Sequence, residues 1–240
     1  MVRVPLWIEM NGLRVLVVGG GGVGSRRAAW FLKAGAEVRV LSLEFRDELV
    51  AEAARNPKLS LIKLDASDEK QVEEHVKWAD IVVIATDNPV VNEIAWRLAR
   101  RHRKLVNDAT NADRTMIVVP YIGEVYNGGL KIAVTSEGLT GVAARHARDK
   151  IIECLESDTE LRTLFEVMWR VKKVLKSLVA EAKKRIPVYF EVEDELMRHR
   201  DVLKRGDLEA AASIAAEVLA KVAGRSVGEI REALLSLRQR

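Results

Sequence analysis

The chain has 240 residues, of which 48% are hydrophobic and 31% charged, and this balance excludes wholesale disorder. Its 39 Lys and Arg against 35 Asp and Glu leave a net charge of +4, too small to indicate a nucleic-acid binder. The single cysteine, Cys154, excludes an intrachain disulfide and a cysteine-based metal cluster. Without a long apolar run or a signal-peptide pattern at residues 1–10, we expect a soluble cytoplasmic protein with no membrane or nucleic-acid partner.

The first half of the chain alternates strand and helix patterns. Apolar, β-branched runs predict strands at 13–18, 36–41, 59–63, 80–85 and 104–107. Helical patterns lie between them at 23–33, 45–55, 68–78 and 89–102. Such alternation with mainly apolar strands predicts an α/β fold, a Rossmann-type doubly wound parallel sheet.

The pattern changes after Asp108. Two further strands are predicted at 115–120 and 130–135, joined as a pair by the loop 123–129. From about Thr140 onward the signal is helical, with Pro187 as a break and Asp207 and Ser226 as expected N-caps. The sequence therefore predicts a Rossmann domain at 1–112, a small strand-pair and helix segment at 113–153, and an all-helical C-terminal domain at 154–240.

A glycine-rich loop, Gly19–Gly24, follows the first predicted strand and opens the first predicted helix. In its Gly-x-Gly-x-x-Gly pattern, Gly19 permits the turn, Gly21 lets the backbone approach a pyrophosphate, and Gly24 allows close helix–strand packing. Gly22 and Val23 lie where the helix N-terminus offers unpaired N–H groups to phosphates. This setting predicts NAD binding; the alternative is a sheet that keeps the turn but binds nothing.

The ribose-binding acid is less clear from the sequence. Ser42 stands where a carboxylate is expected at the tip of the second strand, and Glu44 lies 20 residues after Gly24. Glu44 is either the ribose ligand or an acid of the first turn of the next helix. Arg39 and Arg46 leave NADP open as an alternative to NAD.

Several blocks together carry a family resemblance. They are Pro5–Trp7, Arg14–Gly21, Ala85–Asn92, Leu130–Gly138 and Ala143–Arg145. Over roughly residues 3–152 the chain resembles the sirohaem synthase dehydrogenase/chelatase family. The resemblance implies a precorrin-2 dehydrogenase, which oxidises precorrin-2 to sirohydrochlorin with NAD⁺, and some members also insert ferrous iron to give sirohaem.

The resemblance also assigns residues. It implies a homodimer whose contact is the 113–153 segment, Thr86 and Asp87 where cofactor and pocket meet, and Ser136 in the substrate pocket. The family carries an aspartate where this chain has Thr110. A threonine hydroxyl is a poor general base, so we predict that Asp108, at the end of the fifth strand, replaces that carboxylate.

Two alternatives stay open at this place. Asp113 is the other candidate carboxylate, and Asp108 instead caps a turn through its side chain if its role is structural. Asn107 is expected to orient the base or the nicotinamide amide. The lost aspartate weakens the expectation of iron insertion more than that of oxidation.

The expected substrate is an anionic tetrapyrrole, so cations should line its site. Arg145 and Arg148, which follow Ser136, are the best candidates, with His146 between them. The four histidines lack the spacing of a resident metal site, so none is expected. A non-catalytic NAD- or tetrapyrrole-binding sensor is the alternative function, and Thr110 favours it.

Overall fold

The protein, described here by a computed structural model over residues 3–238, consists of two compact units. One contains the chain up to Val119 together with Glu137–Leu139, and the other contains Pro120–Ser136 and the chain from Thr140 onward. The predicted domain boundaries at residues 112 and 153 stay predictions. Among the described helices, none is long and apolar enough to cross a membrane.

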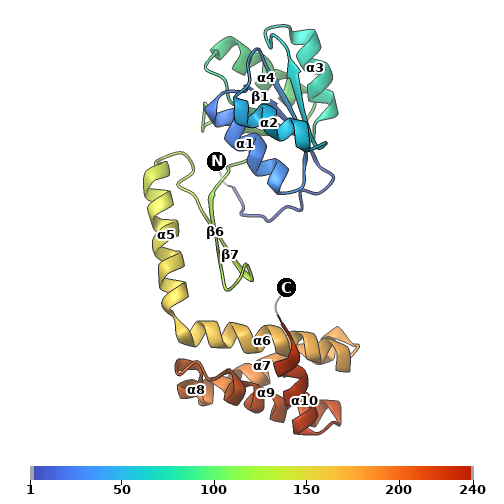
Figure 1. The fold of residues 1–240 in the computed structure, drawn as a ribbon, viewed down its shortest axis with the longest axis vertical. Helices are drawn as coiled ribbons and strands as arrows, with labels where there is room; N and C mark the ends of the chain where they lie inside the picture. The colour runs from blue at the N-terminus through green and yellow to red at the C-terminus, as the bar shows by residue number, and fades with distance from the viewer. Residues whose placement is uncertain (1–2, 239–240) are drawn as a thin grey trace. The chain divides into compact units, whose positions relative to one another are not determined.

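The first unit is built on a five-stranded parallel sheet (Figure 1). Its strands are β1 Arg14–Val18, β2 Glu37–Ser42, β3 Leu59–Lys63, β4 Ile81–Ile84 and β5 Leu105–Asp108. Its helices are α1 Gly22–Lys33, α2 Asp47–Arg55, α3 Glu69–Trp78 and α4 Pro89–Arg101. The strand order β3-β2-β1-β4-β5 confirms the Rossmann-type sheet, with the topological switch point between β1 and β4.

Alternate residues of the central strand enter two separate cores, one on each face of the sheet. Leu16 and Val18 pack with α3 and α4, whereas Val15 and Val17 pack with α1 and α2. All four side chains are fully buried, which is why the strand reads as an unbroken apolar run. The carboxyl ends of the strands therefore converge on one edge, between two helical layers, where α/β sheets bind ligands.

The strand predicted at 115–120 is wrong, because this segment folds back onto the end of β5. Thr115 accepts a hydrogen bond from the backbone N–H of Asp108 at 2.8 Å, and the N–H groups of Met116 and Ile117 both donate to Val106. The backbone N–H groups of Met116 and Ile117 are therefore not available for pairing with β7. Pairing begins only after Pro120, which has no N–H to give to a sheet.

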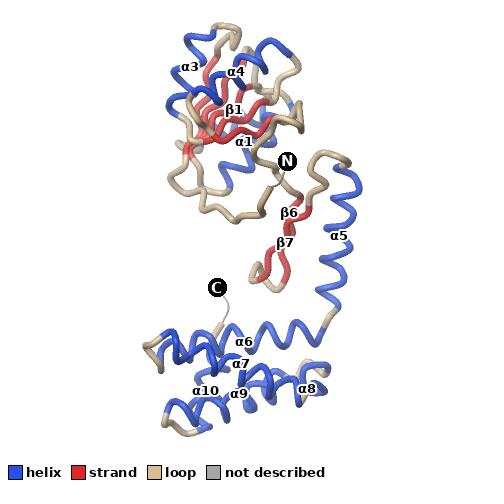
Figure 2. Tube along the Cα trace, turned by 180° about the vertical axis from the view of Figure 1, so that it is seen from behind, coloured by secondary structure: helices blue, strands red, loops and turns tan. Residues whose placement is uncertain are grey.

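The second unit begins with an antiparallel pair, β6 Tyr121–Val125 and β7 Leu130–Val134 (Figure 2, red). This pair confirms the predicted strand pair, with its first strand shifted along the chain. Helix α5, Gly141–Ser157, covers one face of it. Gly123 makes the close approach possible, since a Cβ there would lie 2.4 Å from the Ile152 side chain.

The helical part continues with α6 Thr159–Leu178, α7 Ala182–Arg198, α8 Arg200–Lys204, α9 Leu208–Ala223 and α10 Val227–Ser236. Val171 of α6, Val192 of α7 and Leu219 of α9 are fully buried in one common core. Asp207 and Ser226 are N-caps as predicted. The predicted break at Pro187 is wrong: the helices part at residues 179–181, and Pro187 lies inside α7.

Candidate functional site

The glycine loop follows β1, and close backbone contacts leave no room for a side chain at several of its positions. Gly19 has φ +116°, and a Cβ there would lie 2.4 Å from the carbonyl oxygen of Ala85. A Cβ on Gly24 would lie 1.9 Å from the carbonyl oxygen of Gly19. The turn and the close helix–strand contact thus leave no room for side chains, as the motif predicts.

Gly21 differs from these two. It is the N-cap of α1 with φ −74°, a conformation that any residue adopts, and no atom lies within 4 Å of the Cβ position. Neither the backbone nor the packing in the described structure requires a glycine here. Gly21 borders open space, and no side chain caps α1 within the described residues, so its first-turn N–H groups face an anion-binding position.

A cleft of about 660 Å³ opens at this loop, within the range of small-molecule and cofactor sites. Among the residues predicted to bind cofactor, those that line it are Gly19, Gly21, Gly22, Val23, Ser42, Glu44, Thr86 and Asp87. Thr110 also lines it, whereas Gly24, Asn107 and Asp108 do not. The loops after β1, β2, β4 and β5 therefore meet at one cleft beside the switch point.

At the β2 side of the cleft, Ser42 and Glu44 both reach the lining. Helix α2 begins at Asp47 with Arg46 as its N-cap residue, so Glu44 lies outside the first helical turn. Arg39 stacks on Trp78, with 3.8 Å from its guanidinium carbon to the ring centre. The guanidinium of Arg46, the other arginine considered for a 2′-phosphate, lies close to the loop, 3.4 Å from the Cβ position of Gly22.

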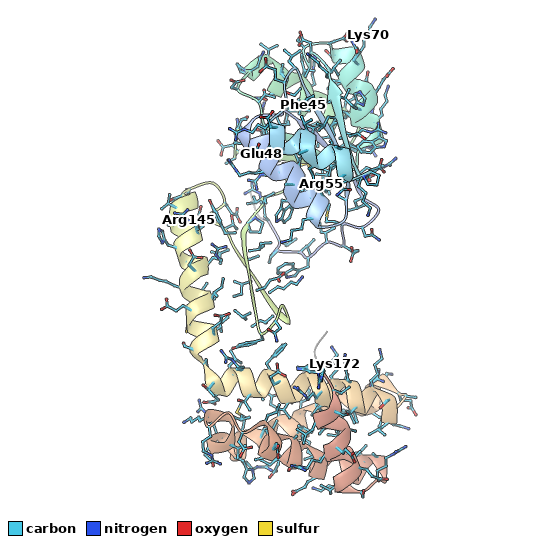
Figure 3. The ribbon with its side chains drawn as sticks, viewed as in Figure 1. Phe45, Glu48, Arg55, Lys70, Arg145 and Lys172 are labelled. Carbon is cyan, nitrogen blue, oxygen red and sulfur yellow. The ribbon has the colours of Figure 1, made fainter. Side chains whose placement is uncertain are left out.

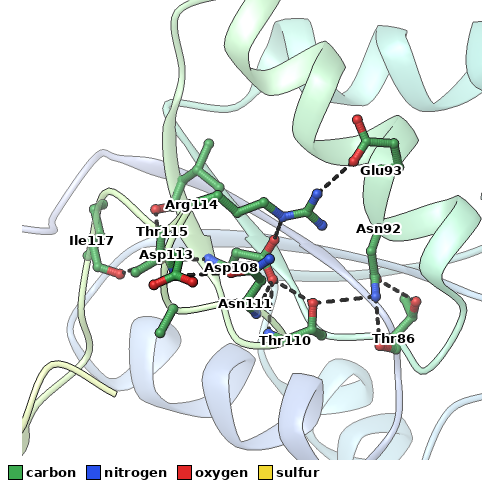
Figure 4. Close-up of polar contacts among 12 residues, drawn as sticks. Thr86, Asn92, Glu93, Asp108, Thr110, Asn111, Asp113, Arg114, Thr115 and Ile117 are labelled. Carbon is green, nitrogen blue, oxygen red and sulfur yellow. Dashed lines mark hydrogen bonds and ion pairs between the residues drawn. The ribbon is translucent and has the colours of Figure 1, made fainter. Parts of the chain in front are cut away.

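At the β5 side, the Asp108 carboxylate is fully buried and bonded at both oxygens (Figure 4). Oδ1 accepts hydrogen bonds from the backbone N–H groups of Thr110, at 2.9 Å, and Asn111, at 3.1 Å, and from the Thr110 hydroxyl at 2.7 Å. Oδ2 accepts from Nε of Arg114 at 2.6 Å. The carboxylate caps its own loop, and of its partners among the described residues Thr110 is the one that lines the cleft.

Arg114 links this loop to α4. Its guanidinium also donates to Glu93 at 2.6 Å and lies 5.4 Å from the centre of the Trp96 ring. Partial burial opposes its charge, but the hydrogen bonds from Arg114 to Asp108 and Glu93 outweigh burial and raise the pKa of Arg114 above its usual range. Arg114 therefore stays charged and fixes the Asp108 carboxylate from behind.

Asn92 of α4 is a site residue that sequence reasoning missed. It is 5% exposed and joins the loops after β4 and β5 (Figure 4). Its Nδ2 donates to the carbonyl of Thr86 at 3.1 Å and lies 3.5 Å from the Thr110 hydroxyl, while its Oδ1 accepts from the Thr86 hydroxyl at 2.6 Å. In the sequence, Asn92 lies four residues after Asn88, the N-cap of α4, and residues four apart lie on the same face of a helix. This spacing could have indicated that Asn92 lies near the same edge of the sheet.

Asn107 is buried on β5, 4% exposed, and lies behind the cleft lining. Its Nδ2 donates to the carbonyl of Ile117 at 2.8 Å, and its Oδ1 has no partner among the described residues. Asp113, the alternative carboxylate, is exposed and also outside the cleft lining. The structure thus brings Thr110, rather than a carboxylate, to this side of the cleft.

The residues expected to bind substrate lie in the second unit. Ser136 exchanges two hydrogen bonds of 2.9 Å with the backbone of Thr140, the N-cap of α5. Arg148 donates to the carbonyl of Ile122 at 2.9 Å and pairs with Asp149. Arg145 and His146 are exposed on the first turns of α5, where Figure 3 labels Arg145. Their role at a substrate pocket stays a prediction.

The strand order, the glycine loop and the cleft define a doubly wound, nucleotide-binding class of protein. A family model described as "Putative NAD(P)-binding" matches residues 6–121. "Siroheme synthase" of Neisseria meningitidis serogroup C (strain 053442) is 32% identical over 176 residues, which is 72% of this chain and 35% of that protein. "Siroheme synthase" of Psychromonas ingrahamii is 33% identical over 178 residues, 73% of this chain and 36% of that protein.

A solved structure of "SirC, precorrin-2 dehydrogenase" has a TM-score of 0.64 at 20% identity, covering 87% of this chain and 98% of that one, and shows the same fold. The chain belongs to the sirohaem synthase N-terminal family and carries its NAD(P)-binding domain. It spans about a third of the length of the curated relatives it matches.

Proposed function

We propose that the protein oxidises precorrin-2 to sirohydrochlorin with NAD⁺ and so acts in sirohaem synthesis. The observation that carries this proposal is the cleft at the glycine loop, in a chain that belongs to this family. The similarity to siroheme synthases at 32–33% identity supports the pathway. The name of the SirC structure supports the oxidation step by analogy of fold.

The residues present fit a dinucleotide. Gly21 leaves an open cradle that a side chain would fill, and the uncapped start of α1 suits a pyrophosphate. Glu44 and Ser42 would hold the adenosine ribose, and Thr86, Asp87 and the loop after β5 would border the nicotinamide. When bound, the dinucleotide supplies a hydride acceptor, and the protein supplies position and electrostatics.

Oxidation also releases a proton from the substrate. Asp108 is the predicted proton acceptor, and among its hydrogen-bond partners in the described residues Thr110 is the one that lines the cleft. Substrate carboxylates would bind the cations of α5, Arg145 and Arg148, with His146 and the Ser136 turn beside them. Asn107 would orient the loop after β5 from behind through its bond to Ile117.

A homodimer is part of the proposal. Within α5, Ala144 is the only buried residue among the helix's 17, and Val142 is 63% exposed on it. One hairpin and one helix bury too little apolar surface to be stable unaided, so a second copy of this segment would complete their core. Sedimentation equilibrium should give twice the 26.8 kDa of one chain, and a monomer would refute this part.

Two finer possibilities remain predictions. Ferrous iron insertion after the oxidation is one, and it needs a proton acceptor for the departing pyrrole protons. The other is a sensor that binds NAD or a tetrapyrrole without chemistry. An enzyme would need a carboxylate that can accept a proton, whereas both oxygens of the Asp108 carboxylate are already bonded. This observation favours the sensor.

Anaerobic mixing of the protein with NAD⁺ and precorrin-2 in single turnover separates these functions. Formation of NADH and of sirohydrochlorin at matching rates is the expected result. Tight NAD⁺ binding without NADH would refute the enzyme and leave the sensor. Adding ferrous iron to the product mixture then shows whether sirohaem forms faster than without protein.

A further inference from the structure

Two threonines that line the cleft, Thr86 and Thr110, each donate their hydroxyl proton to a residue outside the cleft lining. Asp108, ion-paired with Arg114, is a hydrogen-bond acceptor only, so the 2.7 Å contact with Thr110 requires that Thr110 donates. A hydroxyl has one proton, and Thr110 therefore has none left for a ligand. Toward the cleft it can act only as an acceptor.

The orientation of Asn92 follows from the same reasoning. Its Nδ2 must face the carbonyl of Thr86, which cannot donate, so its Oδ1 faces the Thr86 hydroxyl and accepts its proton at 2.6 Å. The same Nδ2 points at Thr110 Oγ1 from 3.5 Å. Asn92 thus adds a weak donor to Thr110 and fixes the distance between the two cleft loops.

The strand order says which part of a dinucleotide meets Thr110. β1, with the glycine loop, lies between β2 and β4, and β5 lies beyond β4. A pyrophosphate held at the glycine loop sends the adenosine toward Ser42 after β2 and the nicotinamide toward the loops after β4 and β5. Thr110 follows β5 and lines the cleft.

We propose that Thr110 accepts a hydrogen bond from the carboxamide N–H of the nicotinamide, and that Asp108 and Asn92 are positioning residues that hold it in this role. The inference rests on the proposed use of NAD⁺. The Asp108 carboxylate removes the donor option from Thr110, so the cleft favours a ring bearing an amide over one bearing only a ketone. Asp108 thereby acts on cofactor choice through Thr110 without touching the cofactor.

Calorimetric titration with NAD⁺ and with its 3-acetylpyridine analogue, which replaces the amide by a methyl ketone, tests the assignment. Thr110→Val should weaken NAD⁺ binding about three- to tenfold, the worth of one hydrogen bond, and leave analogue binding unchanged. Thr110→Ser, which keeps the hydroxyl, should match the unsubstituted protein for both. Equal losses for the two dinucleotides, or no loss for either, would overturn the proposal.

Asp108→Ala provides the second readout, since it leaves Thr110 in place but frees its proton. The preference for NAD⁺ over the analogue should shrink as it does in Thr110→Val, and an unchanged preference would remove Asp108 from the proposal. The unsubstituted protein separates this inference from the proposed function. If it binds neither NAD⁺ nor NADP⁺, the proposed function fails. If it binds NAD⁺ and Thr110→Val keeps the same preference for NAD⁺ over the analogue, only this inference fails.

Discussion

The cleft is bordered at the end of β1 by backbone. At the end of β5 it is bordered by Thr110, which is bonded to side chains outside the cleft lining. The glycine loop has no side chains at its key positions: Gly19 and Gly24 have no space for a Cβ, and Gly21 borders open space. The loop after β5 is fixed instead by Asp108, which collects four hydrogen bonds, and by Arg114 behind it.

The difference between these two ends is one of adjustability. A backbone cradle binds any pyrophosphate and discriminates little between the groups beyond it. A side-chain network fixes which atoms donate and which accept, and a single substitution can reverse that polarity. Affinity for the dinucleotide should therefore depend chiefly on the β1 end, and selectivity and chemistry on the β5 end.

Gly21→Val should have the largest effect, a complete loss of measurable dinucleotide binding. The valine side chain would occupy the open space at the start of α1, and its Cβ meets no atom within 4 Å. The free energy of unfolding should therefore fall only by about 1 kcal/mol, the cost of replacing glycine by valine at an N-cap. Calorimetry and a melting curve give the two readouts. Gly24→Ala is the matched control, because its Cβ would meet the carbonyl of Gly19 and cost about 2–3 kcal/mol of stability.

Asp108→Ala should reduce turnover by about 10²–10⁴ if its carboxylate is the acceptor of the substrate proton. It should also destabilise the fold by about 3 kcal/mol, since Arg114 loses its buried partner. Single-turnover rates, measured below the lowered melting temperature, isolate the chemical effect. Asp113→Ala is the exposed control, and a comparable rate loss there would transfer the role to Asp113.

The glycine end could be predicted from the sequence because its information is local. Gly19 to Gly24 are contiguous, and each position has a backbone reason that needs no knowledge of distant residues. The same holds for the sheet, where fully buried strands such as β1 give continuous apolar runs. Helix caps at Asp207 and Ser226 were equally local, each bonding within its own first turn.

The β5 end could be predicted only in part. The sequence offered Asp108, Asn107 and Thr110 as candidates, but the contact between Thr110 and Asn92 depends on how α4 packs against β4 and β5. The strand expected at 115–120 failed for a related reason. Thr115 bonds to β5 rather than to a neighbouring strand, and the hydrophobic periodicity of the sequence does not distinguish these two pairings.

Asn92→Ala should have a smaller effect, a loss of about 1–2 kcal/mol in the free energy of unfolding. Without the amide, the Thr86 hydroxyl and carbonyl lose partners, and the two loops are no longer joined. Asp68→Ala is the control: it removes the N-cap of α3 at a cost of about 1 kcal/mol and has no part in the cleft lining. Of the two variants, Asn92→Ala alone should also weaken NAD⁺ binding. Equal NAD⁺ binding in both would contradict the role of Asn92 in holding the loops after β4 and β5 together.

Ser25→Ala should have the smallest effect and tests the comparison most directly. The Ser25 hydroxyl donates to the carbonyl of Gly20 at 3.1 Å, the counterpart in the glycine loop of the Asn92 bonds. Because that loop is shaped by its backbone, losing this one side-chain bond should cost only about 0.5–1 kcal/mol and change NAD⁺ affinity by less than about threefold. Calorimetry and thermal unfolding measure both. A larger loss of affinity than in Asn92→Ala would show that the β1 end also depends on side chains, and the two ends of the cleft would then differ in degree rather than in kind.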